Sequence, residues 1–226
     1  MSKTDQTTAY HGSLDDSIKA FKPLSHFGCR DAALAAAAAK YFHPDNLVVK
    51  TSAFLYTVRL KLVSSFVLDG IDFGGPSPRA LLSHLPEMLS QYPLLAGEAS
   101  AASLRILRES GERSAGQNDA LHVALGLLSK IGKQVIRYPN KCESAGEYSF
   151  AVIDPSLVEI VGSPDVISMD DLERGFYFLQ YGRSVAELIH PNDWGKPNPE
   201  PRTYFKYSEA SYLTDRASFF ARTKNQ

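Results

Sequence analysis

The prediction of the fold starts from the stretch Thr7–Phe42, "TTAYHGSLDDSIKAFKPLSHFGCRDAALAAAAAKYF". It contains two short segments that combine a histidine with a glycine, and an alanine-rich run follows the second one. We expect short strands over 9–12 and 26–28, each ending at its glycine. The alanine run predicts a helix over 31–42, because alanine has the highest intrinsic helix propensity. The stretch therefore predicts two short strands and, after the second, a helix.

The segment between the two strands is typical of a helix start. Residues 13–16 have a serine suited to an N-cap and two aspartates suited to a first turn. A short helix is therefore expected over 17–21, ended by Pro23. Residues 1–8 are polar and are expected to form a flexible tail.

The rest of the chain shows both strand and helix patterns. Apolar and polar residues alternate within "SAFLYTVRLKLVSSFVLD", residues 52–69, which indicates a strand buried on one face. Further helices are expected over 79–89, 99–109 and 119–130, and further strands over 135–138, 149–155 and 157–161. Residues 165–226 are expected to contain short helical pieces and a Pro-rich turn.

Composition limits the classes of function. The 226 residues include 24 basic and 25 acidic side chains, for a formal net charge of -1, so no extended nucleic-acid surface is expected. The two cysteines, Cys29 and Cys142, form no CxxC pair, and no Cys/His cluster has zinc spacing, so we expect no metal site and a reducing compartment. With no apolar signal segment and no long apolar run, we expect a cytoplasmic protein without a membrane partner.

Three segments carry a family resemblance. They are Tyr-His-Gly-Ser at 10–13, Ser-His-Phe-Gly at 25–28 before the alanine-rich helix, and "YPNKCESAGEYSFAVIDP" at 138–155. In this order they resemble the ADP-ribosyltransferase superfamily, in particular the small domains of bacterial and phage polyproteins and effectors. The resemblance covers residues 9–161. It implies an α+β fold in which two small split antiparallel sheets form an NAD cleft flanked by helices, with residues 162–226 as a C-terminal extension packed on the core.

The resemblance also implies roles for individual residues in binding NAD. His11 would hydrogen-bond the ribose hydroxyls, and Gly12 would hold the nicotinamide carboxamide through its backbone. Ser13 would help to shape that contact, and His26 or Phe27 would line the nicotinamide pocket. The full set of implied cofactor-binding residues is Tyr10, His11, Gly12, Ser13, His26, Phe27 and Ser149. A packing role in the core is the alternative for Phe27.

The catalytic carboxylate is expected in the loop before the last part of the motif. In the poly-ADP-ribose polymerase branch a glutamate begins the corresponding strand, but Ser149 holds that place here. The resemblance therefore assigns catalysis to Glu143 together with His11, with Glu147 as the alternative carboxylate. A carboxylate suits this chemistry because cleavage of the nicotinamide–ribose bond passes through an oxocarbenium-like transition state.

The resemblance implies an NAD-dependent ADP-ribosyltransferase. Such an enzyme uses NAD as a substrate, releases nicotinamide and modifies a macromolecular acceptor, in the first place a protein. It would act as a bacterial or phage toxin or effector in the bacterial cytosol, or on a host target in the host cytosol. Two alternatives stay open. One is an NAD glycohydrolase with the same site, and the other is an inactive module that binds NAD, ADP-ribose or a partner.

Overall fold

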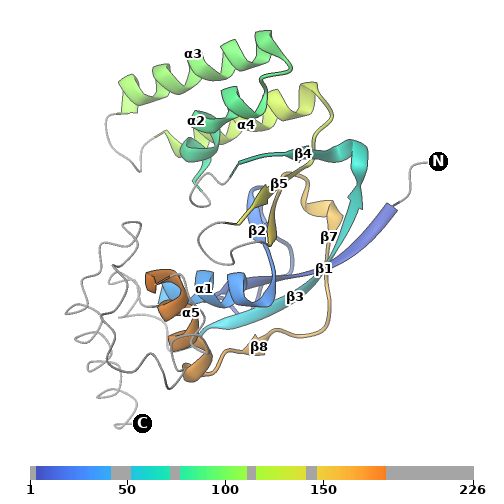
Figure 1. Ribbon diagram of the computed structural model, residues 1–226, viewed down its shortest axis with the longest axis vertical. Coiled ribbons are helices and arrows are strands. Elements are labelled where there is room, and N and C mark those ends of the chain that lie inside the picture. Colours follow the sequence, from blue (N-terminus) through green and yellow to red (C-terminus); the bar gives the residue numbers. More distant parts are fainter. Residues whose placement is uncertain (1–3, 42–51, 72–76, 111–115, 141–146, 182–226) are drawn as a thin grey trace, which may run out of the picture.

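The chain has an α+β fold, seen in a computed structural model that describes residues 4–41, 52–71, 77–110, 116–140 and 147–181. Within these residues five α-helices accompany two four-stranded sheets (Figure 1). The first sheet is antiparallel and contains β1 (Thr4–Ser13), β3 (Phe54–Val63), β7 (Val158–Ile160) and β8 (Asp165–Val166). The second has the order β2 (Ser25–Phe27), β6 (Tyr148–Val152), β5 (Val135–Pro139) and β4 (Val67–Asp69), and only β4 and β5 run parallel.

Strand β1 begins earlier than the sequence predicts. It pairs with β3 along its whole length, from Thr4 opposite Val63 to Ser13 opposite Phe54. The prediction of a flexible tail over residues 1–8 is therefore wrong from Thr4 onward. The physical reason is that the long strand β3 runs opposite each of these residues and forms main-chain hydrogen bonds with alternate ones, which their polar side chains do not reveal.

An isolated bridge joins the two sheets between Tyr10 of β1 and Gly28, the residue that follows β2. Tyr10 N–H donates to the Gly28 carbonyl at 2.9 Å, and Gly28 N–H donates to the Tyr10 carbonyl at 3.1 Å. An apolar cluster with members from both sheets lies beside this bridge. Its buried members are Ala9, Phe21, Phe27, Tyr56, Val58, Leu60 and Val152. The bridge and the cluster together fix the position of β1 relative to β2.

The predicted short helix over 17–21 does not form. Ser13 Oγ accepts a hydrogen bond from Asp15 N–H at 3.0 Å, and Asp15 Oδ1 accepts one from Ser17 N–H at 2.9 Å. The Tyr56 hydroxyl then donates to the Asp15 carbonyl at 2.9 Å and accepts from Ile18 N–H at 3.0 Å. The main-chain groups that a helix would need are therefore bound by local turns and by a tyrosine from β3.

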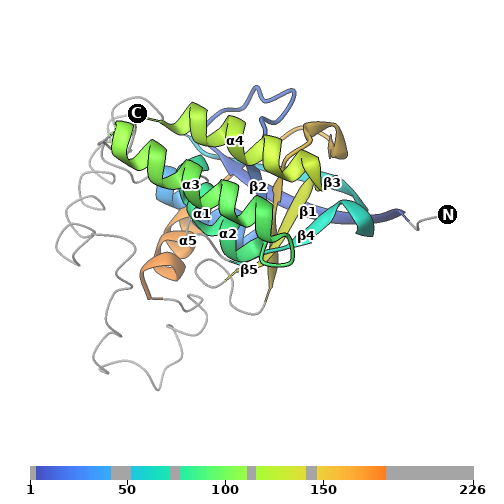
Figure 2. The same cartoon turned by 90° about the horizontal axis from the view of Figure 1, so that it is seen from above.

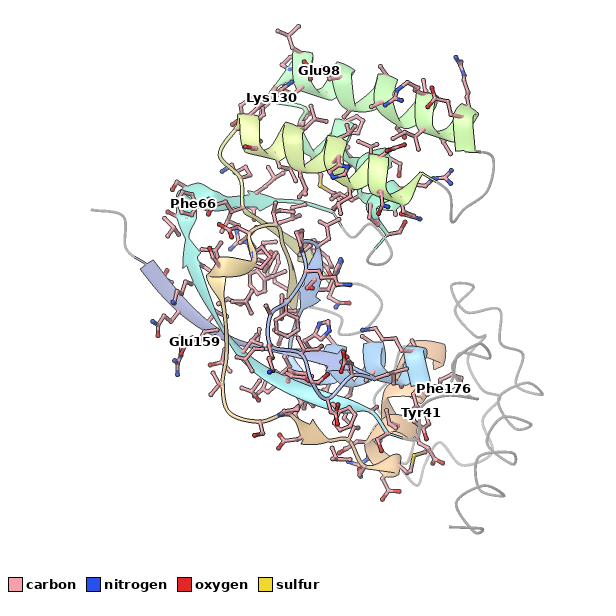
Figure 3. All side chains as sticks on the ribbon, turned by 180° about the vertical axis from the view of Figure 1, so that it is seen from behind. Tyr41, Phe66, Glu98, Lys130, Glu159 and Phe176 are labelled. Carbon is pink, nitrogen blue, oxygen red and sulfur yellow. The ribbon has the colours of Figure 1, made fainter. Side chains whose placement is uncertain are left out.

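Helix α1 (Arg30–Tyr41) packs on β1 and on helix α5 (Met169–Tyr181). Figure 3 shows Tyr41 and Phe176, which belong to the same buried cluster, on the side of the molecule where these two helices lie. A Cβ atom on Gly175 would lie 2.6 Å from the Leu34 carbonyl oxygen, so the two helix backbones approach closely. Within the predicted C-terminal extension over 162–226, β8 thus pairs with β3 and α5 packs on α1, and residues 182–226 lie outside the described part of the chain.

Three helices form a separate layer against the second sheet (Figures 1 and 2). They are α2 (Pro78–Met88), α3 (Pro93–Ser110) and α4 (Gln117–Lys130). Their buried side chains share a cluster with Ile136, Tyr138 and Ala151 of the sheet. Helix α3 starts before the predicted Ala99, because Pro93 is well suited to a first helical position. Among the residues that the structure describes, no helix is long and apolar enough to cross a membrane.

Candidate functional site

His11 is held by the main chain of the neighbouring strand. Its Nδ1 atom lies 2.7 Å from the carbonyl oxygen of His26. A carbonyl can only accept a hydrogen bond, so Nδ1 carries the proton and, in a neutral ring, Nε2 is left as an acceptor. The structure thus brings the ring of His11 to the backbone of His26, and the implied roles of both residues in binding NAD stay predictions.

The His11 ring is neutral near pH 7. The pKa of His11 is lowered to about 4, mainly by burial and in part by the charge of Lys40, while the hydrogen bond to His26 acts in the opposite direction. At neutral pH the side chain therefore presents an uncharged acceptor nitrogen rather than a cation. Such a nitrogen can accept a hydrogen bond from a hydroxyl group.

Two phenylalanines fix the orientation of the His11 ring. The ring centroid lies 4.9 Å from that of Phe21 and 5.5 Å from that of Phe27, and the two phenylalanine rings are 4.8 Å apart. Phe27 is 1% exposed. Its ring therefore packs in the core beneath His11, which is the alternative role considered for it from the sequence.

Gly12 has a packing role that requires no ligand. A Cβ atom at this position would lie 2.1 Å from the Ala33 carbonyl oxygen and 2.7 Å from the Ala37 Cβ atom. Only glycine lets helix α1 approach β1 so closely. The role of Gly12 in holding a carboxamide stays a prediction.

The backbone of Gly12 points away from the first sheet. Tyr10 directs both its N–H and its carbonyl to Gly28, on the side of β1 opposite to β3. Gly12 lies two residues further along the strand, so the alternation of a β-strand directs its N–H and carbonyl to the same side. Lys40 Nζ donates to this Gly12 carbonyl at 2.7 Å. This contact of Lys40 is not predicted from the sequence. Its signal is the spacing of Ala33, Ala37 and Lys40, which puts all three on one face of a helix.

His26 faces away from Phe27, because neighbouring residues of a strand point to opposite faces. Its Nδ1 atom lies 2.6 Å from the Tyr138 hydroxyl oxygen, and Tyr138 belongs to the cluster beneath the three-helix layer. The imidazole of His26 thus interacts with Tyr138 of β5. Its carbonyl interacts with His11.

Ser149 and Asn140 form a buried polar pair in the second sheet. Asn140 Nδ2 donates to Ser149 Oγ at 2.8 Å, and both side chains are at most 3% exposed. A Cβ atom on Gly28 would lie 2.7 Å from Ser149 Oγ, which places this pair beside the bridge between the sheets. Tyr138 and Asn140 belong to the motif at 138–155, but no role for them is predicted from the sequence. Because they are two residues apart, their side chains point to the same face of the sheet. Tyr138 lies opposite Ser149, so this is also the face of Ser149.

The remaining predicted residues are distributed as follows. Glu143 lies outside the described residues. Glu147 is exposed, directly precedes β6 and accepts a hydrogen bond from Asn140 N–H at 2.8 Å through its carbonyl. Ser13 Oγ is engaged with the Asp15 N–H, and Tyr10 packs against the α1 side of β1. No group of three or more metal-ligating side chains occurs within the ranges that the structure describes.

The site thus combines an uncharged acceptor nitrogen, a lysine ammonium and a glycine backbone at one end of β1. The imidazole nitrogen can accept a hydrogen bond from a hydroxyl group of a ligand. Comparison of the chain with protein-family models, with curated proteins and with solved structures gives no match.

Proposed function

We propose that the protein is an ADP-ribosyltransferase that uses NAD as its ADP-ribose donor. The observation that carries this proposal is the state of His11, whose Nδ1 proton is fixed by the His26 carbonyl and whose pKa of about 4 keeps the ring neutral. A neutral ring with Nε2 as acceptor can receive a ribose hydroxyl. Gly12 follows at once on the same strand, with its backbone directed away from the first sheet.

In this proposal the dinucleotide binds where β1 meets β2, between the two sheets. His11 orients the ribose next to nicotinamide, and Gly12 meets the carboxamide. The two main-chain hydrogen bonds between Tyr10 and Gly28 hold His11 and Gly12 in a fixed position. The substrate would then be oriented with no conformational change in the protein.

The carboxylate comes from the segment before β6. Glu147 is two residues before Ser149, so strand alternation directs both side chains to one face. Its main chain is held by Asn140, whose side chain also binds Ser149. These contacts favour Glu147, the alternative carboxylate from the sequence, because they fix its main chain. Glu143, the first choice from the sequence, lies outside the described residues.

The reaction breaks the bond between the ribose C1′ and the pyridine nitrogen. The bonding electron pair leaves with the nitrogen, so nicotinamide departs neutral, and the ribose becomes oxocarbenium-like. The glutamate stabilises this positive charge. An acceptor nucleophile then bonds to C1′ and gives its proton to the glutamate carboxylate, which acts as the base. With water in place of a macromolecule, the same steps would make the protein an NAD glycohydrolase.

The proposal is tested by measuring nicotinamide release from NAD by the purified chain, with and without cell lysate. Glu147→Gln and Glu143→Gln are compared with Glu159→Gln, an exposed glutamate of β7 that pairs with Arg59. Release that one of the first two variants abolishes and the third retains supports the mechanism. Dependence on lysate identifies transfer to a partner. Binding of NAD without release favours the inactive binding module.

A further inference from the structure

Strand β1 has an unpaired edge over its first half. Tyr10 directs its N–H and carbonyl to Gly28, on the side away from β3, and the main-chain groups of a strand alternate between its two edges. The groups that point to this outer edge before Tyr10 are therefore those of Thr4, Gln6 and Thr8. Within the described part of the chain, no hydrogen bond reaches the outward main-chain groups of Gln6 or Thr8.

The outer edge of β1 lacks the features that usually protect an edge strand. Natural edges are blunted by a short strand, a bulge, a proline, a lysine or a covering element. Strand β1 has ten residues in unbroken register with β3, so it is long and has no bulge, and it contains neither lysine nor proline. Asp5, Gln6 and Thr8 are exposed, and Figures 1 and 3 show α1 and α5 at the other end of the strand. The main-chain groups of this edge are therefore exposed to pairing with another strand.

The second sheet limits the length of this edge. From Tyr10 onward its groups are already bound, first by Gly28 and then by Lys40, which binds the Gly12 carbonyl. We call the remaining part, residues 4–8, the β1 edge. Its three outward residues are centred on Gln6, so an antiparallel strand that pairs with all three has its own middle residue opposite Gln6.

The β1 edge is complementary to itself in this register. When two copies pair antiparallel about a two-fold axis at Gln6, Thr4 of one copy lies opposite Thr8 of the other. Each opposed pair of outward residues then exchanges two main-chain hydrogen bonds. In the intervening pairs Asp5 lies opposite Thr7 of the other copy, whose hydroxyl can donate to the carboxylate.

We propose that the β1 edge pairs with the β1 edge of a second copy of this chain, so that their first sheets form one continuous sheet. A two-fold interface of this kind closes on two copies. A register centred on Asp5 would put two carboxylates opposite each other, and one centred on Thr7 would need the groups of Tyr10 that Gly28 already binds. The register centred on Gln6 avoids both. This inference does not depend on the proposed function.

The experiment measures the oligomeric state of the full chain by sedimentation equilibrium over a range of concentrations. We expect a reversible dimer with a Kd of about 100 µM or tighter, as suits a small interface. Gln6→Pro removes the outward N–H at the centre of the edge but no N–H that pairs with β3, and it should raise the Kd more than about tenfold. Gln6→Ala is the matched control, because it changes the same side chain and retains the N–H, and it should dimerise as the wild type does.

Two substitutions at Thr7 test the register. Thr7→Asp puts a second carboxylate opposite Asp5 of the other copy and should raise the Kd by about tenfold, because the pair occurs twice in the dimer. Thr7→Lys puts an ammonium there and should lower the Kd. A change in the same direction for both variants would contradict the register centred on Gln6.

Amide hydrogen exchange of the wild type decides the matter even if Gln6→Pro does not fold. The amides of Gln6 and Thr8 should become protected as the concentration rises, whereas that of Thr7, which points to β3, should be protected at every concentration. A wild type that stays monomeric up to about 1 mM overturns the proposal and leaves the edge to a strand of another protein. A dimer that Gln6→Pro leaves unchanged, or in which the Gln6 and Thr8 amides exchange as in the monomer, overturns it as well.

Discussion

The His11 Nδ1 atom donates to the carbonyl oxygen of His26 at 2.7 Å, and this bond joins the last part of β1 to β2. It determines the tautomer of His11 and leaves Nε2 as the acceptor. Because the ring is also buried, the site depends on an uncharged histidine. This relationship has consequences for stability as well as for binding.

Stability should fall in acid through His11. The pKa of His11 is lowered from its ordinary value of 6.5 to about 4, so between these pH values the unfolded chain binds a proton that the folded chain does not. The free energy of unfolding is therefore undiminished above pH 6.5 and decreases as the pH falls toward 4, by on the order of 3 kcal/mol in total. The measurement is urea unfolding at several pH values for the wild type and His11→Asn, whose amide can still donate to the His26 carbonyl. The same pH dependence in both proteins would contradict this role.

Gly12→Ala should destabilise the fold even without a ligand. The new Cβ atom would lie 2.1 Å from the Ala33 carbonyl oxygen, so helix α1 must move, at a cost of more than about 2 kcal/mol. The control is Gly97→Ala on α3, where nothing lies within 4 Å of the new atom. That change should stabilise by up to about 1 kcal/mol, because alanine is the better helix former. Equal midpoints of urea unfolding for the two variants would show that α1 does not pack on β1 in this way.

Helix α5 should contribute to the stability of the whole domain. Gly175→Ala would place a Cβ atom 2.6 Å from the Leu34 carbonyl oxygen and should cost about 1–3 kcal/mol in thermal or urea unfolding. Gly126→Ala on α4 is matched to it, since no atom lies within 4 Å there. If Gly175→Ala proved as stable as Gly126→Ala, α5 would have to be regarded as separate from the core.

The Tyr138 hydroxyl should hold His26 in place. Tyr138→Phe removes the partner at 2.6 Å from His26 Nδ1 and should lower the free energy of unfolding by about 1 kcal/mol or more, because the site is part-buried. Tyr148→Phe, at a position 53% exposed, should have almost no effect. An unchanged stability for Tyr138→Phe would mean that another group replaces the hydroxyl.

The parts of the fold that the sequence predicts are those in which local preference and packing agree. The alanine run forms α1, and the alternating stretch forms β3, because propensity and burial favour the same structure there. Residues 17–21 fail to form a helix because the Tyr56 hydroxyl, 38 residues from Ile18 in the chain, binds their main chain. The tail forms a strand because β3 extends far enough to pair with it. Such partners cannot be inferred from local sequence.

The candidate site is likewise only partly predictable from the sequence. The predicted strands put His11 and Gly12 on one strand and His26 on the next. It did not reveal that Gly12 is required by Ala33, that Lys40 binds the Gly12 carbonyl, or that His26 and Phe27 face opposite sides of β2 with different partners. These relationships arise from the crossing of α1 over β1 and from the pairing of β2 with β6.

The most direct measurement is nicotinamide release from NAD by the wild type and by His11→Asn, with folding of both checked by unfolding midpoints. Asparagine retains a donor for the His26 carbonyl but has no acceptor at the position of Nε2. We expect the wild type to release nicotinamide and His11→Asn to release it about tenfold more slowly, or slower still. No release by the wild type with or without lysate, or equal release by both proteins, would contradict the central claim that His11 orients a dinucleotide for cleavage.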